Sequence, residues 1–280
     1  QICWELHDIN IFTPSKGIRG KLQTLFLKTV SQPTLVGKYA DIIIVHAYSL
    51  KKKLEERGVK GNKIHVILHF DYMYLLDSNN NKPTALDFAL PKDYALFFGK
   101  IAPWKGISVL VNAARILSKQ VYKFTIVIAG GSFYEDENET SPIEDLLTKE
   151  DHDHIQILNK YIINSEIPEL FKKSAFLILP YTNAFQYSTS GVIPLAYTFS
   201  KPVIVSDVPS LVEYVDHGKT GFVFEAGNSS QLANYIIELL EDNRKCIEMG
   251  NNAYQKMLQE MSLERFCQLL NDLYVDTERR

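Results

Sequence analysis

The chain has 280 residues, of which 46% are hydrophobic and 22% are charged, and its formal net charge is −3 at pH 7. These values fit a globular protein of one large or two modest domains, and the near-neutral charge argues against a nucleic-acid partner. Three scattered cysteines without a CxxC pair argue against a disulfide scaffold or a zinc site and favour a cytoplasmic location. No apolar run reaches the roughly 20 residues that span a bilayer, which leaves peripheral membrane association open.

The first part of the chain predicts short strands and one helix. The strands are expected at 2–6, 40–45 and 63–69, and the helix at 50–57, with Ser49 as its N-cap. Since residue 1 is glutamine and a strand pattern follows at once, we expect that an N-terminal segment is missing. A polar stretch over 77–91, with three consecutive asparagines and two prolines, predicts a domain boundary.

The rest of the chain alternates regularly between apolar runs and amphipathic segments. Strands are predicted at 94–98, 124–129, 155–158, 175–179, 203–206 and 221–224. Helices are predicted at 105–120, 142–151, 165–173, 190–199, 210–215, 229–258 (with a break near Gly250) and 263–275. This alternation predicts an α/β fold with a Rossmann-like, doubly wound parallel sheet, whose ligands bind at the carboxyl ends of the strands.

The loop after the strand at 94–98 carries two lysines. Gly99 allows close backbone approach, and Lys100 and Lys105 can converge on an anion at the start of the next helix. From spacing alone, a capped loop with solvated lysines is an equally good interpretation. A second such loop carries Gln186 and the run Ser188, Thr189, Ser190 and Gly191 before an apolar helix. Its free N–H groups suit a phosphate, and N-capping by Thr189 or Ser190 is a compatible interpretation.

Other polar residues carry weaker signals. Glu213 lies near the carboxyl end of a strand, although such a residue is more often part of a solvated helix surface. His7 follows the opening strand, where a structural histidine is the more common case. His65 and His69 lie four residues apart on one face of a predicted strand, without enough further ligands for a metal. Walker A, GxGxxG, HExxH and GxSxG patterns do not occur in the sequence.

Taken in order, these segments resemble the retaining glycosyltransferases of family 4, the glycosyl transferases group 1 domain with the GT-B fold. The resemblance covers about residues 94–240, with weaker similarity upstream. The matching segments are Gly99-Lys100 with Lys105-Gly106, Ala129-Gly130-Gly131, the loop from Pro180 to Gly191, Pro202-Val203-Ile204, Glu213-Tyr214-Val215 and Gly218 with Gly221.

The resemblance implies a domain organisation and a chemistry. Residues 1–78 would be the remnant of an N-terminal acceptor-side domain, 79–262 the nucleotide-sugar-binding domain, and 263–280 a helix packing back toward the N-terminal domain. The reaction would transfer a sugar from a nucleoside diphosphate sugar to an acceptor hydroxyl with retention, without a cofactor or a metal. The acceptor would be a saccharide or a lipid-linked molecule, in polysaccharide or glycolipid synthesis at or near the inner face of the cytoplasmic membrane.

The resemblance also assigns site residues. His7, Lys100 and Lys105 would be catalytic, the lysines by offsetting the charge of the leaving diphosphate. The donor would contact Gly99, Gly131, Tyr161, Ile162, Gln186, Ser188, Thr189, Ser190, Gly191 and Glu213.

One departure from the family leaves alternatives open. The family's paired glutamates fall at Tyr187 and Leu195, and the second of them usually binds ribose. The chain is therefore either a divergent enzyme that uses Gln186 and its hydroxyl cluster, or a non-catalytic nucleotide- or sugar-binding relative. A third hypothesis is another GT-B enzyme, such as a nucleotide-sugar epimerase.

Overall fold

A computed structural model describes residues 3–6, 37–77, 90–120, 123–132, 142–183 and 188–278. Its N-terminal part contains a small parallel sheet in the order β1 (Cys3–Leu6), β2 (Ile42–Val45) and β3 (Ile64–Val66). The four residues of β2 are buried, since this central strand has α3 (Tyr48–Glu56) on one face and a C-terminal helix on the other. All three strands were predicted, with bounds within a few residues.

The larger part is a six-stranded parallel sheet. Its strands are β4 (Tyr94–Phe98), β5 (Ile126–Ala129), β6 (Ile155–Leu158), β7 (Ser174–Leu179), β8 (Val203–Ser206) and β9 (Gly221–Phe224), in the order β6-β5-β4-β7-β8-β9. From β4 the chain first winds outward through β5 and β6, and then returns to the other side of β4 through β7, β8 and β9. This is the doubly wound arrangement that the sequence predicts, and its order reverses beside β4.

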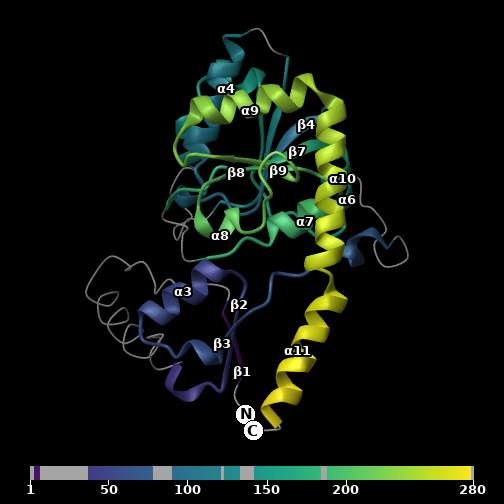
Figure 1. Cartoon of the computed structure of the whole chain (residues 1–280). Coiled ribbons are helices and arrows are strands. Elements are labelled where there is room, and N and C mark those ends of the chain that lie inside the picture. Colours follow the sequence, from purple (N-terminus) through teal and green to yellow (C-terminus); the bar gives the residue numbers. More distant parts are fainter. Residues whose placement is uncertain are drawn as a thin grey trace, which may run out of the picture.

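Helices cover both faces of this sheet. They are α4 (Ile107–Ser118), α5 (Pro142–Leu146), α6 (Ile167–Lys173), α7 (Val192–Thr198), α8 (Pro209–Val212), α9 (Ser229–Glu241) and α10 (Asn243–Glu260). The last helix, α11 (Leu263–Glu278), packs on the small sheet instead. Helix α4 packs on α9, and α7 packs on α10. Figure 1 shows α10 and α11 running along one side of the molecule, from the six-stranded unit down to the small sheet.

The prediction of a helix over 229–258 with a break near Gly250 is wrong about the position of the break. The helix breaks at Asp242, whose side chain accepts a hydrogen bond from the Lys245 N–H and so caps α10. Gly250 lies inside α10, where a Cβ atom would stand 2.1 Å from the carbonyl oxygen of Ser200. The glycine is therefore used for close packing of the helix against a loop, which its sequence neighbourhood does not reveal.

The predicted cap of α3 is also wrong. The helix begins at Tyr48, so Ser49 lies inside its first turn, and Ala47 at the N-cap has no side-chain acceptor. The acceptor comes from the other part of the chain, because the Glu213 carboxylate receives the N–H groups of Tyr48 and Ser49. The first turn is thus satisfied by a residue more than 160 positions away.

Two further contacts join the small sheet to the larger part. The Tyr214 hydroxyl donates to the His46 carbonyl (2.7 Å) and accepts from the His69 N–H (3.0 Å). Phe266 of α11 packs in a cluster with Ile42, Ile44 and Ile67. Where the domain boundaries lie stays a prediction, and most of the polar stretch at 77–91 is outside the described residues.

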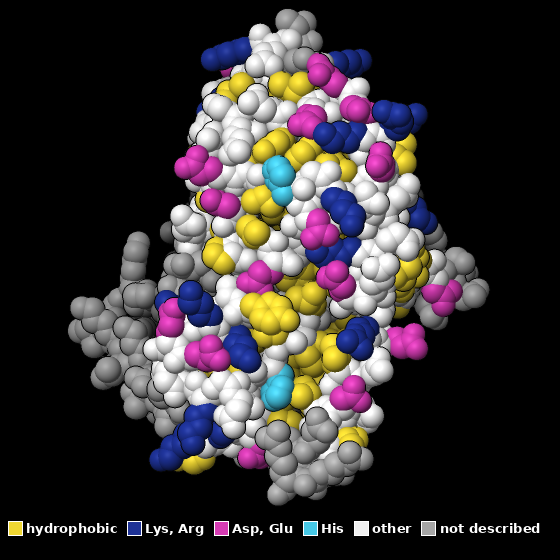
Figure 2. Space-filling model, viewed as in Figure 1, with side chains coloured by type: hydrophobic (Ala, Val, Ile, Leu, Met, Phe, Trp, Pro, Cys, Tyr) yellow, Lys and Arg dark blue, Asp and Glu magenta, His cyan; other side chains and the backbone are white. Residues whose placement is uncertain are grey.

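Among the described residues, no helix is long and apolar enough to cross a bilayer. On the face shown in Figure 2, lysine and arginine side chains are interspersed with aspartate and glutamate side chains. This mixture agrees with the small net charge of the whole chain.

Candidate functional site

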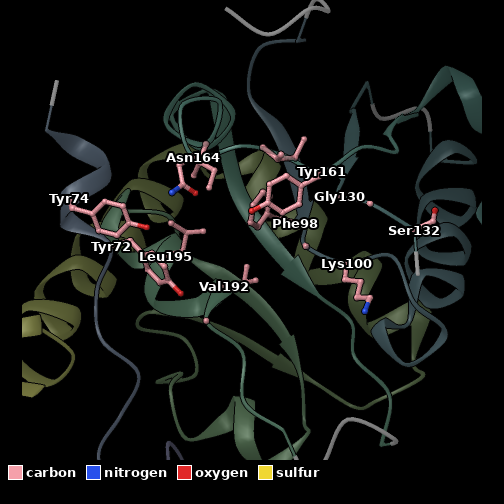
Figure 3. A pocket seen from close by; sticks show the side chains of 15 residues that line it. Tyr72, Tyr74, Phe98, Lys100, Gly130, Ser132, Tyr161, Asn164, Val192 and Leu195 are labelled. Carbon is pink, nitrogen blue, oxygen red and sulfur yellow. The ribbon is translucent and has the colours of Figure 1, made fainter. Parts of the chain in front are cut away.

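A cavity of about 580 Å³ opens where the order of the large sheet reverses. Its walls come from the carboxyl ends of β4, β5 and β6, the start of α7 and a 3₁₀ turn at Met73–Leu76. A doubly wound sheet leaves such a crevice because the loops after β4 and β7 lead away in opposite directions. The lining residues are Tyr72, Tyr74, Phe98, Gly99, Lys100, Gly130, Gly131, Ser132, Tyr161, Ile162, Asn164, Ile167, Gly191, Val192 and Leu195 (Figure 3).

Lys100 brings positive charge to the cavity. It follows Gly99 at the end of β4, and Figure 3 shows its ammonium at the opposite side of the cavity from Tyr72 and Tyr74. Desolvation lowers the pKa of Lys100, and the nearby charge of Lys105 lowers it further. A bound dianion would relieve that repulsion, so this corner of the cavity is suited electrostatically to a phosphate group.

Lys105 lies outside the cavity lining and instead covers an aromatic ring. Its ammonium is 3.7 Å from the centre of the buried Tyr181 ring, a cation–π contact. The Tyr181 hydroxyl lies 3.2 Å from the Ser190 hydroxyl, just before α7. Lys105 and Ser190, which the sequence places in separate loops, are therefore linked through Tyr181, which the sequence reasoning did not select.

The backbone at Tyr161 and Ile162 is held by two polar anchors. The Asn159 amide oxygen accepts from the N–H (2.9 Å) and the hydroxyl (2.8 Å) of Ser132, which ties the loops after β5 and β6 together. The buried Glu166 carboxylate receives the Lys160 ammonium at 2.7 Å and the Ile163 N–H at 3.2 Å. This fixed loop presents Ile162 and the largely exposed Tyr161 to the cavity.

The start of α7 is not capped by the side chain of its N-cap residue. Gly191 is the N-cap residue, and the helix lacks a side-chain cap. The Ser190 hydroxyl lies 3.4 Å from the Val192 N–H, and the Ser188 carbonyl receives a hydrogen bond from Ser210. Gly191, Val192 and Leu195 face the cavity, so Leu195 occupies the wall with an alkyl group.

The structure distributes the predicted site residues unevenly. It brings together Gly99, Lys100, Gly131, Tyr161, Ile162 and Gly191 around the cavity. It places Lys105, Ser188, Thr189, Ser190 and Glu213 outside that lining, with Glu213 directed at the start of α3. His7 and Gln186 lie outside the described residues. Their roles in ligand binding stay predictions.

Sequence reasoning missed the aromatic part of the lining. Tyr72 and Tyr74 precede and enter the 3₁₀ turn in a segment that reads only as a connection, and Phe98 ends β4 as an ordinary strand residue. The only available signal was the unusual density of tyrosine before the polar stretch at 77–91. Across the part of the chain that is described, no three His, Cys, Asp or Glu side chains gather in a way that would hold a metal ion.

The sequence of the chain is similar to those of known glycosyltransferases. Residues 78–256 match the glycosyl transferases group 1 family. A glycosyltransferase of Methanocaldococcus jannaschii is 28% identical over 160 residues, which are 57% of this chain and 42% of that protein. The capsular polysaccharide biosynthesis glycosyltransferase CapM of Staphylococcus aureus is 23% identical over 241 residues, 83% of this chain and 60% of CapM.

The fold itself matches solved glycosyltransferase structures. HepE of Anabaena, solved in complex with UDP, superposes with a TM-score of 0.73 at 20% identity, over 98% of this chain and 72% of HepE. The chain spans about half the length of the curated relatives it matches. With the family match covering most of the chain and the fold agreeing, this protein has the GT-B fold and belongs to the glycosyl transferases group 1 family.

Proposed function

We propose that this chain is the donor-binding part of a retaining family 4 glycosyltransferase, which transfers a sugar from a nucleoside diphosphate sugar to an acceptor hydroxyl. The observation that carries the proposal is the cavity at the sheet reversal, where Lys100 stands among the glycine turns of Gly99, Gly130 and Gly131. Glycine turns let a ligand approach the backbone closely, and the lysine supplies charge for a diphosphate.

The chemistry assigned to these residues is charge stabilisation without a metal. As the bond from the sugar to the diphosphate breaks, negative charge builds up on the leaving phosphate. Lys100 would face this charge directly, and Lys105 would add to the field from its position over Tyr181. His7 would lie on the sugar and acceptor side of the cleft, as the family resemblance implies.

The donor and the biological setting are also part of the proposal. UDP or a UDP-sugar is the first donor to test, since HepE has been solved with UDP and with UDP-glucose. CapM, and a Klebsiella pneumoniae protein from a cps region that is 23% identical over 237 residues, favour polysaccharide synthesis. A saccharide or lipid-linked acceptor, reached from the cytoplasm at the membrane surface, is consistent with that setting.

One observation favours a second candidate function. Leu195 stands on the cavity wall where the resemblance expects a glutamate, so the ribose would lose its usual carboxylate partner. A non-catalytic protein that binds nucleotides or sugars with the same fold would tolerate this loss. Catalytic turnover, rather than binding, separates the two candidates.

The first experiment measures ligand binding by thermal shift with UDP, GDP, UDP-glucose, UDP-N-acetylglucosamine and GDP-mannose, with and without EDTA. A ligand present at about 100 times its Kd should stabilise the protein by about 2.7 kcal/mol. Lys100→Ala should abolish the shift, while Lys149→Ala, on an exposed lysine away from the cavity, should keep it. Absence of any shift in the folded protein would refute the donor site, and an EDTA-sensitive shift would refute metal independence.

Activity is tested on the full-length protein. Transfer of radiolabelled sugar from the donor that binds would support the enzyme, and the anomeric configuration of the product, read by NMR, tests retention. Tight donor binding without transfer to saccharide or lipid-linked acceptors, and without donor hydrolysis, would favour the non-catalytic alternative.

A further inference from the structure

The side of the cavity opposite Lys100 is lined by tyrosine side chains. Tyr72 and Tyr74 project from the connection between the small sheet and the large one, and Figure 3 shows them beside Leu195. Asn164 reaches the same region from the loop after β6. This side therefore offers neutral hydrogen-bonding groups, whereas the positive charge is concentrated at Lys100.

The Tyr72 hydroxyl lies against the start of α7. A Cβ atom built on Gly191 would be 2.6 Å from the Tyr72 hydroxyl oxygen and 3.5 Å from Nε2 of His69. Gly191 and Leu195 are four residues apart, so they share one face of the helix. The Tyr72 hydroxyl therefore lies at the N-terminal end of the α7 face that lines the cavity, the same face that carries Leu195.

Tyr72 is held in place from its backbone and from its ring. Its N–H donates to the Thr198 hydroxyl at 3.1 Å, and its ring stacks on the His69 ring with centroids 6.0 Å apart and 13° between the planes. The His69 backbone is fixed in turn by the Tyr214 hydroxyl. Within the described part of the chain, no residue forms a hydrogen bond with the Tyr72 hydroxyl, so it can serve a ligand.

The lining of the cavity also limits what this hydroxyl can bind. Among the described residues, the fifteen that line the cavity include no aspartate or glutamate. Burial raises the pKa of Tyr72, and the neighbouring Tyr74 adds to the effect, so the phenol stays protonated and both donates and accepts hydrogen bonds. An uncharged diol matches such a group better than a phosphate, for which Lys100 supplies charge, or a flat base, for which Phe98 and Tyr161 supply aromatic rings in the lining.

We propose that the Tyr72 hydroxyl binds a ribose hydroxyl of the nucleotide and makes the site selective for ribonucleotides. The proposal rests on the proposed function, since it assigns one part of that donor to one part of that cavity. Tyr72 would replace a carboxylate as the ribose partner, which explains how Leu195 can stand on the α7 wall of a nucleotide site. His69 would act as a positioning residue for the Tyr72 ring.

The test compares UDP with 2′-deoxy-UDP and 3′-deoxy-UDP by calorimetric titration, with the three guanosine counterparts in parallel. The wild-type protein should bind one deoxy analogue about fivefold more weakly than the parent nucleotide, as expected for one hydrogen bond. Tyr72→Phe should weaken the parent nucleotide by a similar factor and should leave the affinity for that deoxy analogue unchanged. Tyr235→Phe, whose ring stacks on Phe222 far from the cavity, is the matched control.

Each other outcome overturns the proposal in a distinct way. If the affinity lost by removing the ribose hydroxyl and the affinity lost by Tyr72→Phe simply add, the ribose hydroxyl and the Tyr72 hydroxyl do not contact each other. A loss for UDP-glucose without a loss for UDP would assign Tyr72 to the transferred sugar instead. If wild-type protein binds neither UDP nor GDP, the proposed function fails first and the ribose assignment fails with it. If it binds UDP and Tyr72→Phe binds equally well, only the ribose assignment fails.

Discussion

The Glu213 carboxylate accepts a hydrogen bond from the Ser49 N–H at 2.7 Å, across the junction between the two sheets. Its other oxygen receives the Tyr48 N–H, so a residue beside α8 caps α3. A carboxylate at this position satisfies two N–H groups and also interacts favourably with the positive end of the helix. The family resemblance implies that Glu213 binds the donor, and this role stays a prediction; in the structure the Glu213 carboxylate contacts the start of α3.

Replacing Glu213 should therefore reduce stability rather than nucleotide affinity. Glu213→Ala should lower the free energy of unfolding by about 1 kcal/mol, the usual cost of losing a helix cap. Thermal denaturation measures the loss, with Glu248→Ala, on an exposed part of α10, as the control. A variant with normal stability but weakened UDP binding would instead assign Glu213 to the donor.

The two lysines should contribute unequally to nucleotide binding and to its pH dependence. Lys100 lines the cavity, so Lys100→Met should cost more UDP affinity than Lys105→Met. Burial and the charge of Lys105 lower the pKa of Lys100. UDP affinity should therefore fall as the pH rises above neutrality, and this fall should begin at a lower pH than it would for a lysine with an ordinary pKa. Lys105→Met removes the repulsion and should move that fall to higher pH. Identical pH profiles for wild type and Lys105→Met, measured by titration calorimetry, would contradict this coupling.

Gly106 joins the lysine loop to α4 at a position where a side chain should be strongly destabilising. It has φ of +68°, and a Cβ atom would lie 1.7 Å from the Pro180 carbonyl oxygen. Gly106→Ala should destabilise the protein by about 3 kcal/mol or more, from backbone strain and the forced displacement of Pro180. Gly218→Ala is the matched control, with φ of +79° and open space around the new methyl group, and should cost only about 1 kcal/mol. Equal losses in denaturant titrations would show that the Pro180 contact is unimportant.

Acid should weaken the partly buried ion pair between Arg115 and Asp151, beside the six-stranded sheet. The Arg115 guanidinium donates to both carboxylate oxygens of Asp151, at 3.1 and 2.7 Å, and lowers the pKa of Asp151 to about 2. A depressed carboxyl pKa stabilises the fold above the unfolded-state value near 4, and this stabilisation disappears as pH falls from about 4 to about 2. The contribution at neutral pH is about 2 kcal/mol.

Asp151→Asn tests that ion pair. The stability difference between wild type and the variant, from urea unfolding, should shrink as the pH falls from about 4 to about 2. Asp153→Asn, on an exposed neighbour, should show no such trend. A difference that stays constant across this range would mean that the carboxylate charge of Asp151 does not stabilise the fold.

The order of the strands and helices was readable from the sequence because it depends on local patterns. Apolar runs such as 94–98 and 203–206 alternate with amphipathic segments, and each was confirmed as a buried parallel strand. Glycines at strand ends marked the loops that became cavity walls, and so Gly99, Lys100 and Gly131 were selected correctly as neighbours. Whether they bind the donor stays a prediction.

Only the tertiary structure decided which distant groups meet. The sequence by itself determined a parallel α/β fold with a lysine and glycines at its strand ends, because hydrophobic periodicity and turn residues act within a few positions. The cap of α3 by Glu213, the stacking of Lys105 on Tyr181 and the placing of Tyr72 against Gly191 join residues from 76 to 164 positions apart. Such contacts depend on how the two sheets and the linker pack together, and packing of surfaces that are far apart in the chain leaves no local pattern to read.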